Sequence, residues 1–177
     1  MIRLFAALAV PDEIVESLTR RQTGLEGARW RGPEQLHLTL RFFGEVREDV
    51  ARDLDAELSS VGGAPFDIVL EGVGAFGEGG DIDTIWAGVA ESTELRRLAK
   101  ACETAARRAG LKPETRNYRP HLTLAYLRHP DPEKVAGWIQ ANNLLKSPPI
   151  RIERFGLYSS FLASDGAQYR LEAEYAL

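Results

Sequence analysis

Two copies of one tetrapeptide carry the chemistry that this sequence offers. His-Leu-Thr-Leu occurs at residues 37–40 and again at 121–124, and the two copies contain two of the three histidines in the 177-residue chain. Side chains alternate between the faces of a β-strand, so the His and the Thr of each copy would share one face and the leucines the other. Each copy therefore presents one imidazole beside one hydroxyl.

Two imidazoles facing one phosphate could hydrolyse a phosphodiester. Because histidine titrates near neutral pH, one of His37 and His121 would take a proton from water while the other gives a proton to the leaving oxygen. The hydroxyls of Thr39 and Thr123 would donate hydrogen bonds to the non-bridging phosphate oxygens, where charge builds up. This chemistry requires no metal and no cofactor, and we expect none.

Side chains near the two motifs are candidates for substrate contact. By the same alternation, Arg41 shares a face with His37, and Arg119 shares one with His121 if the second strand begins before the proline at 120; either arginine could bind phosphate. Aromatic residues close to the motifs could stack on a nucleobase. These residues are Trp30, Phe42, Phe43, Tyr118 and Tyr126.

Hydrophobic periodicity predicts the elements that must position these residues. The predicted strands lie at about 2–9, 35–42, 66–75, 83–90, 121–127, 150–158 and 168–175. The predicted helices open at residue 11 or 12, span about 48–61 and 93–109, and open again at 131–132. The glycine-rich segment 71–81 is interpreted as a hairpin loop.

The sequence also shows an internal repeat. The two tetrapeptides begin 84 residues apart, at 37 and 121, and the same offset relates Pro65 to Pro149, Gly72 to Gly156 and Leu54 to Trp138. We therefore predict an α+β fold in which residues 1–177 form a single domain of two pseudo-symmetric lobes. If the pseudo-two-fold axis brings the two motif strands side by side, the two His-Thr pairs converge on one cleft.

Composition limits the classes of protein that fit. A net charge of −4 and a pI of about 5.5 disfavour a broad electrostatic footprint on nucleic acid, so any phosphate must be held locally. The single Cys102 excludes an internal disulfide, and the apolar run at the N-terminus stops at Pro11, too early for a membrane span. We expect a cytoplasmic monomer with no membrane contact and no obligate protein partner.

The paired motifs resemble those of the 2H phosphoesterases. The segments MIRLFAALAVPDE, RWRGPEQLHLTLRFFGEV, IWAGV, YRPHLTLAY and GLYSSFLASDGAQYRLEAEYAL look like the bacterial RNA 2′,3′-cyclic phosphodiesterases, historically called 2′-5′ RNA ligases. The resemblance implies a duplicated two-lobe fold whose antiparallel sheets line a central cleft, with helices outside. It also implies hydrolysis of RNA 2′,3′-cyclic phosphate ends, or of small cyclic nucleotides, to 2′-phosphates.

The same resemblance implies roles for individual residues. His37 would be the proton donor and His121 the proton acceptor, while Thr39 and Thr123 would bind phosphate. The family often has an arginine two residues beyond the second tetrapeptide, where this chain has Tyr126.

Other functions remain open on the sequence alone. A non-catalytic module that binds RNA ends would tolerate altered motifs, yet both tetrapeptides are intact. A metal hydrolase would need a cluster of ligands at a spacing that the sequence lacks, and His129, in an Arg-His-Pro-Asp turn, is interpreted as a solvated loop residue. RNA ligation, the reverse of phosphodiester opening, would use the same two histidines.

Overall fold

The computed structural model describes every residue, 1–177, as an arrangement of ten strands and four α-helices. The strands are β1 (Ile2–Ala9), β2 (Arg29–Trp30), β3 (His37–Val46), β4 (Phe66–Ile68), β5 (Leu70–Phe76), β6 (Thr84–Val89), β7 (His121–Tyr126), β8 (Ile150–Ile152), β9 (Arg154–Ala163) and β10 (Gly166–Ala176). The helices are α1 (Asp12–Thr19), α2 (Glu48–Ser59), α3 (Thr93–Arg108) and α4 (Pro132–Asn142), and single 3₁₀ turns lie at Pro33–Gln35 and Gly79–Asp81.

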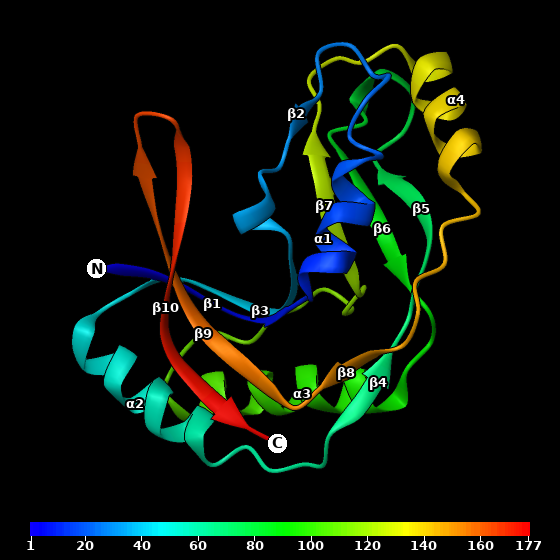
Figure 1. The fold of residues 1–177 in the computed structure, drawn as a ribbon. Helices are drawn as coiled ribbons and strands as arrows, with labels where there is room; N and C mark the ends of the chain where they lie inside the picture. The colour runs from blue at the N-terminus through cyan, green and yellow to red at the C-terminus, as the bar shows by residue number, and fades with distance from the viewer.

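The strands form two antiparallel four-stranded sheets and one antiparallel pair. The first sheet has the order β10-β9-β1-β3, the second has the order β2-β7-β6-β5, and β4 pairs with β8. Helices α2 and α3 pack together beneath the first sheet, and α4 covers the outer side of the second (Figure 1). The predicted α+β class, with antiparallel sheets and outer helices, is confirmed.

The β4–β8 pair lies where the two halves of the sequence meet. The bounds of these strands differ by the same 84 residues as the two tetrapeptides, and Asp67 of β4 lies opposite Arg151 of β8, its own counterpart in the repeat. Counterparts would face each other in this way at a two-fold axis, so this pairing is consistent with the predicted pseudo-symmetry, and the division into two lobes stays a prediction.

Each sheet combines strands from both halves of the sequence. The first sheet takes β1 and β3 from the first half and β9 and β10 from the second, and the second sheet takes β2, β5 and β6 from the first half and β7 from the second. No single cut in the chain therefore separates the two sheets. The predicted strands at 66–75 and 150–158 are therefore interrupted, at Val69 and Glu153, where the chain passes from the central pair into a four-stranded sheet.

The glycine-rich segment was predicted as a loop, but most of it is strand. β5 runs through Gly72 and Gly74, and the connection to β6 is confined to residues 77–83. Gly74 is required by packing, because a Cβ there would lie 2.4 Å from the Trp86 ring. The glycine-rich composition suggested a loop, whereas Gly74 allows the Trp86 ring to lie close to the backbone of β5 inside the sheet.

A single hydrophobic core joins both sheets to all four helices. The leucines of the two motifs are among its most buried members, with Leu38, Leu122 and Leu124 fully buried and Leu40 3% exposed. Burying a leucine side chain contributes roughly 2 kcal/mol, which holds each motif strand with its His and Thr on the opposite face. None of the helices is long and apolar enough to cross a membrane.

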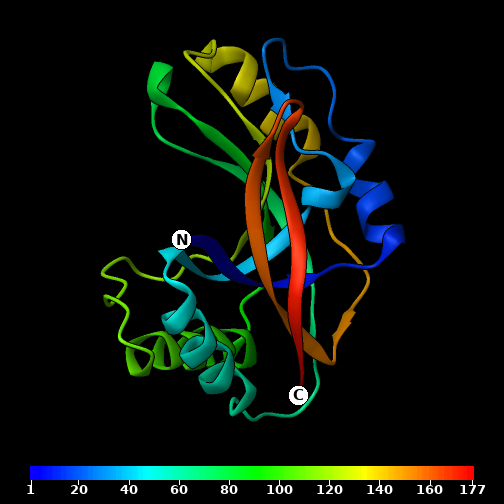
Figure 2. The same ribbon diagram turned by 90° about the vertical axis from the view of Figure 1, so that its left-hand side faces the viewer.

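The β9–β10 hairpin projects beyond the rest of the first sheet (Figure 2). It is longer than predicted, because β9 continues to Ala163 and β10 begins at Gly166. Side chains near its tip, including Phe161 and Leu162, line the cavity described below.

Candidate active site

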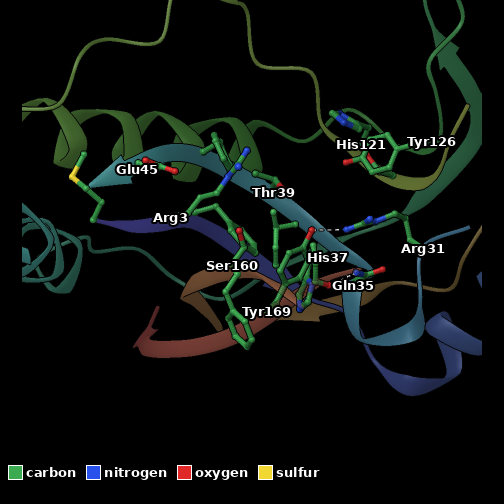
Figure 3. A pocket seen from close by; sticks show the side chains of 17 residues that line it. Arg3, Arg31, Gln35, His37, Thr39, Glu45, His121, Tyr126, Ser160 and Tyr169 are labelled. Atoms are coloured by element: carbon green, nitrogen blue, oxygen red, sulfur yellow. Dashed lines mark hydrogen bonds between the residues drawn. The ribbon is translucent and has the colours of Figure 1, made fainter. Parts of the chain in front are cut away.

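Both tetrapeptides line one cavity of about 580 Å³. β3 contributes His37 and Thr39, and β7 contributes His121 and Thr123. The two strands belong to different sheets but contact each other where the sheets meet, so the motifs approach the cavity from two sides (Figure 3).

A β-bulge at the end of each tetrapeptide decides which side chains follow the motif into the cavity. In β3 the register slips at Leu40, so Leu40 and Arg41 both face the helices and Phe42 returns to the cavity. In β7 the register slips at Leu124, the counterpart of Leu40, and Tyr126 reaches the cavity. A strict alternation of faces does not continue past the tetrapeptide.

The prediction that Arg41 shares a face with His37 is therefore wrong. The Arg41 Nε lies 2.5 Å from a carboxylate oxygen of Glu103 in α3, and its guanidinium also donates to the carbonyl of Lys112. Its side chain is only 10% exposed and does not line the cavity. Arg41 ties β3 to α3 rather than binding a substrate.

Arg119 was also predicted as a substrate contact, and its side chain lies outside the cavity too. It is exposed, and it precedes the start of β7, so the strand alternation does not extend to it. Its backbone carbonyl, however, accepts a hydrogen bond from the ring of His121 at 2.6 Å.

The candidate stacking residues divide into two groups. Phe42 and Tyr126 line the cavity and are 42% and 38% exposed. The others support the fold: Phe43 is in the core, Trp30 packs against Trp138, and Tyr118 donates a hydrogen bond to the Thr39 carbonyl. His129 is exposed in a turn, as predicted.

His121 is held in one tautomer. Because a carbonyl can only accept, the hydrogen bond to Arg119 places a proton on Nδ1 and leaves Nε2 for a ligand. The ring edge packs against Phe76 at 4.8 Å, and Trp86 lies 6.3 Å away. Burial lowers the pKa of His121, and the Arg119 carbonyl offsets part of that shift.

His37 sits in a different environment. It is enclosed by Tyr158 at 4.8 Å and Tyr169 at 5.8 Å, and Tyr158 lies over Gly156, where a Cβ would come within 2.7 Å of its ring. The buried Nδ1 forms no hydrogen bond of normal geometry. Burial lowers the pKa of His37, with a partial offset from the nearby Gln35 carbonyl.

The two threonine hydroxyls have no hydrogen-bond partner in the protein. The Oγ1 atoms of Thr39 and Thr123 make no bond, and neither is a buried unsatisfied group. Both residues are half-buried at the cavity wall. They are therefore free to donate to an acceptor placed between the histidines.

Two arginines that sequence reasoning missed supply the positive charge of the cavity. Arg31 donates a 2.6 Å hydrogen bond to the Tyr169 hydroxyl and lies over the Tyr126 ring at 5.0 Å (Figure 3). Arg3 lies over the Phe42 ring at 5.2 Å. Neither forms a salt bridge. Arg31 was missed because it follows a strand of two residues, β2, that is too short to leave a periodic pattern.

Comparison with known proteins places these features in a family. Residues 10–160 match the model of the 2′-5′ RNA ligase superfamily. The chain is 33% identical over 172 residues to an RNA 2′,3′-cyclic phosphodiesterase of Archaeoglobus fulgidus, covering 96% of this chain and 97% of that one. It is 31% identical to a protein of the same name from Thermus thermophilus, covering 99% and 90%.

Solved structures of other proteins show the same fold. A crystal structure of a Thermus thermophilus protein superposes with a TM-score of 0.81 at 27% identity, covering 99% of this chain and 98% of the other. LigT of Escherichia coli, crystallised with 3′-AMP, superposes with a TM-score of 0.79 at 26% identity and the same coverage. With the two HLTL strands meeting at one cavity in this shared fold, the chain belongs to the 2′-5′ RNA ligase superfamily of 2H phosphoesterases.

Proposed function

We propose that this protein hydrolyses RNA 2′,3′-cyclic phosphate ends to 2′-phosphates, without a metal ion, by general acid–base catalysis. The observation that carries the proposal is the meeting of both His-Thr pairs at one cavity. The relatives named RNA 2′,3′-cyclic phosphodiesterase, which align over nearly the whole chain, support the same reaction.

His121 is suited to be the general base. Its Nδ1 proton is engaged by the Arg119 carbonyl, so the neutral ring offers its lone pair at Nε2. Burial favours the neutral form by lowering the pKa. In the proposed reaction Nε2 takes a proton from water as the water oxygen attacks phosphorus.

His37 is suited to be the general acid. The bond between phosphorus and the 3′ oxygen breaks, and His37 gives a proton to that oxygen, leaving a 3′ hydroxyl and a 2′-phosphate. Burial keeps the pKa of His37 low in the free protein, but a bound phosphate favours the imidazolium through its charge. Substrate binding thus supplies the protonation that the acid needs.

Thr39, Thr123 and Arg31 would stabilise the charge on the reacting phosphate. The two hydroxyls are unpaired at the cavity wall and can bond non-bridging oxygens as their charge grows. Arg31, fixed by Tyr169 and stacked on Tyr126, can present its remaining N–H groups to the same oxygens. It occupies the side of the cavity where Tyr126 replaces the arginine frequent in the family.

The direct test uses a short RNA ending in a 2′,3′-cyclic phosphate, with EDTA present throughout. We expect the end to become a 2′-phosphate, identified by sensitivity to phosphatase and, after digestion of the RNA, by chromatography of the terminal nucleotide against authentic 2′- and 3′-phosphate standards. A 3′-phosphate product would contradict the proposed leaving group. An unchanged end with a folded protein would favour a non-catalytic module that binds RNA ends, and loss of activity only with EDTA would require a metal.

Ligation is a second candidate because the matching family is named for it. A 5′ hydroxyl in the place of water would attack the cyclic phosphate, and expulsion of the 3′ oxygen would create a 2′-5′ linkage. Adding an RNA with a 5′ hydroxyl to the same assay measures the ratio of joined to hydrolysed product. Because water is far more concentrated, we expect hydrolysis to dominate.

A further inference from the structure

The cavity has an arginine stacked on an aromatic ring on each side of the motifs. Phe42 and Tyr126 occupy the same position relative to the two tetrapeptides, two residues past the second leucine, and each bulge turns its ring into the cavity. Arg3 lies over the first ring and Arg31 over the second. The cavity therefore offers two separate positions for negative charge.

The two arginines differ in how they are held. Arg31 is half-buried, bonded to Tyr169 and placed over two rings, whereas Arg3 is exposed and makes no hydrogen bond through its side chain. Tyr169 also lies beside His37, so Arg31 belongs to the reaction centre. Arg3 belongs to the open end, where its neighbours include the hairpin residues Phe161 and Leu162.

The position of Arg3 can be followed along β1. Ala7 of β1 pairs with Thr39, and Phe5 pairs with Phe42, two residues further from the reaction centre, or about 7 Å along the strand. Arg3 is two residues further still, but its guanidinium lies over the Phe42 ring. The side chain thus points back toward the motifs and holds its charge roughly one nucleotide away from Thr39.

We propose that Arg3, supported by Phe42, binds the 5′ phosphate of the nucleotide that carries the cyclic end. This inference rests on the proposed function and specifies its substrate class: an RNA strand, whose terminal nucleotide has a second phosphate on its 5′ side, rather than a cyclic mononucleotide that lacks one. A guanidinium stacked on a ring keeps its in-plane N–H groups free to bind phosphate oxygens in a bidentate manner.

Neighbouring groups complete the subsite. Ser160 pairs in register with Arg3 and lines the cavity, so its hydroxyl is a second donor beside the guanidinium. Glu45, on the other side of Arg3, makes no ion pair with it and can accept a hydrogen bond from a ribose hydroxyl. Phe161 and Leu162, 50% and 88% exposed, extend the wall with apolar surface for the preceding base.

The test measures binding without requiring turnover. Isothermal titration calorimetry would compare adenosine 2′,5′-bisphosphate with adenosine 2′-monophosphate, which differ only in the 5′ phosphate. Because charge-assisted bonds are strong, we expect the wild-type protein to prefer the bisphosphate by about tenfold or more. Arg3→Gln should reduce the preference to less than twofold, whereas Arg52→Gln, an exposed arginine on α2, should keep it.

A wild-type preference near one, or a preference that survives in Arg3→Gln, would overturn the inference. A kinetic comparison then separates it from the proposed function. Adenosine 2′,3′-cyclic phosphate with a 5′ phosphate should be hydrolysed with a lower KM than the same compound without one, and Arg3→Gln should remove the difference. Failure to open either compound, while the binding preference holds, would refute the proposed function and leave the subsite standing.

Discussion

The two halves of the active site carry the same tetrapeptide in different surroundings. On the β7 side, His121 is oriented by a 2.6 Å hydrogen bond to a backbone carbonyl and packs against Phe76 and Trp86. On the β3 side, the buried Nδ1 atom of His37 forms no hydrogen bond of normal geometry, although the nearby Gln35 carbonyl offsets part of the lowering of its pKa by burial, and the ring is enclosed by tyrosines. Identical motifs thus lie in different surroundings, although burial lowers the pKa of both imidazoles.

This difference in surroundings supports the proposed assignment of base to His121 and acid to His37. A ring with a fixed Nδ1 proton presents a lone pair and suits a base. In the proposed mechanism, His37, which lies beside the Tyr169–Arg31 pair, would gain its proton when the charge of the substrate favours the imidazolium. The two strands carry the same tetrapeptide, and the side chains packed around each strand make their surroundings unequal.

The largest expected effect comes from removing either imidazole. His37→Ala and His121→Ala should each lower kcat by about a hundredfold to ten-thousandfold, because each removes one proton transfer. A cyclic substrate with sulphur in place of the bridging 3′ oxygen has a leaving group that needs no proton. It should restore much of the activity of His37→Ala and little of that of His121→Ala. If this substrate instead restored the activity of His121→Ala, then His121 would be the acid and His37 the base.

A smaller effect should follow from removing the hydroxyls. Thr39→Val and Thr123→Val keep the branched shape that suits a strand but delete the donor, so kcat should fall by roughly tenfold to a hundredfold with little change in stability. Steady-state kinetics and thermal denaturation measure the two quantities. An effect on one side only would show that the phosphate contacts the motifs unequally, and no effect on either would remove the threonines from the mechanism.

The residue after each tetrapeptide distinguishes the two sides by stability rather than rate. Arg41 follows the first motif and forms an ion pair with Glu103 of α3, whereas the buried Ala125 follows the second motif. Arg41→Met should lower the free energy of unfolding by about 2 kcal/mol, because it leaves a partly buried carboxylate without its partner, and should leave the kcat of the folded protein unchanged.

The control for that variant is Arg47→Met, which removes an exposed ion pair with Asp49 and should cost less than about 0.5 kcal/mol. Urea denaturation measures both changes. A large fall in kcat for the folded Arg41→Met protein would make Arg41 a substrate contact again.

The smallest expected effect is a displaced pH profile. Burial lowers the pKa of both histidines in the free protein, so the bell-shaped profile of kcat/KM should have its maximum below the ordinary imidazole value of about 6.5. Bound phosphate favours the imidazolium, so the profile of kcat should lie at higher pH. At pH 7.5, kcat should therefore retain a few-fold larger fraction of its maximum than kcat/KM does. Coincident profiles would show that substrate charge does not act on His37.

Sequence reasoning recovered most of the elements and the pair of motifs because both leave local patterns in the sequence, whereas β2 and the breaks at Val69 and Glu153 leave none. Period-two alternation located β3 and β7, and helical spacing located α2 and α3. The 84-residue offset, read from other positions, also relates Asp67 to Arg151, which the structure shows to be paired. The same alternation was wrong at Arg41, because a bulge forms only when a strand pairs with its neighbour.

The motifs and the face on which their His and Thr side chains lie were determined by the sequence itself, since burial of the flanking leucines leaves those side chains no other face. Only the tertiary structure decided which charges join them. Arg31 and Arg3 come from segments with no motif and reach the cavity through strand pairing across the chain. The different surroundings of His37 and His121 have the same origin, because the rings that pack against each imidazole come from distant segments: Tyr158 and Tyr169 for His37, and Phe76 and Trp86 for His121.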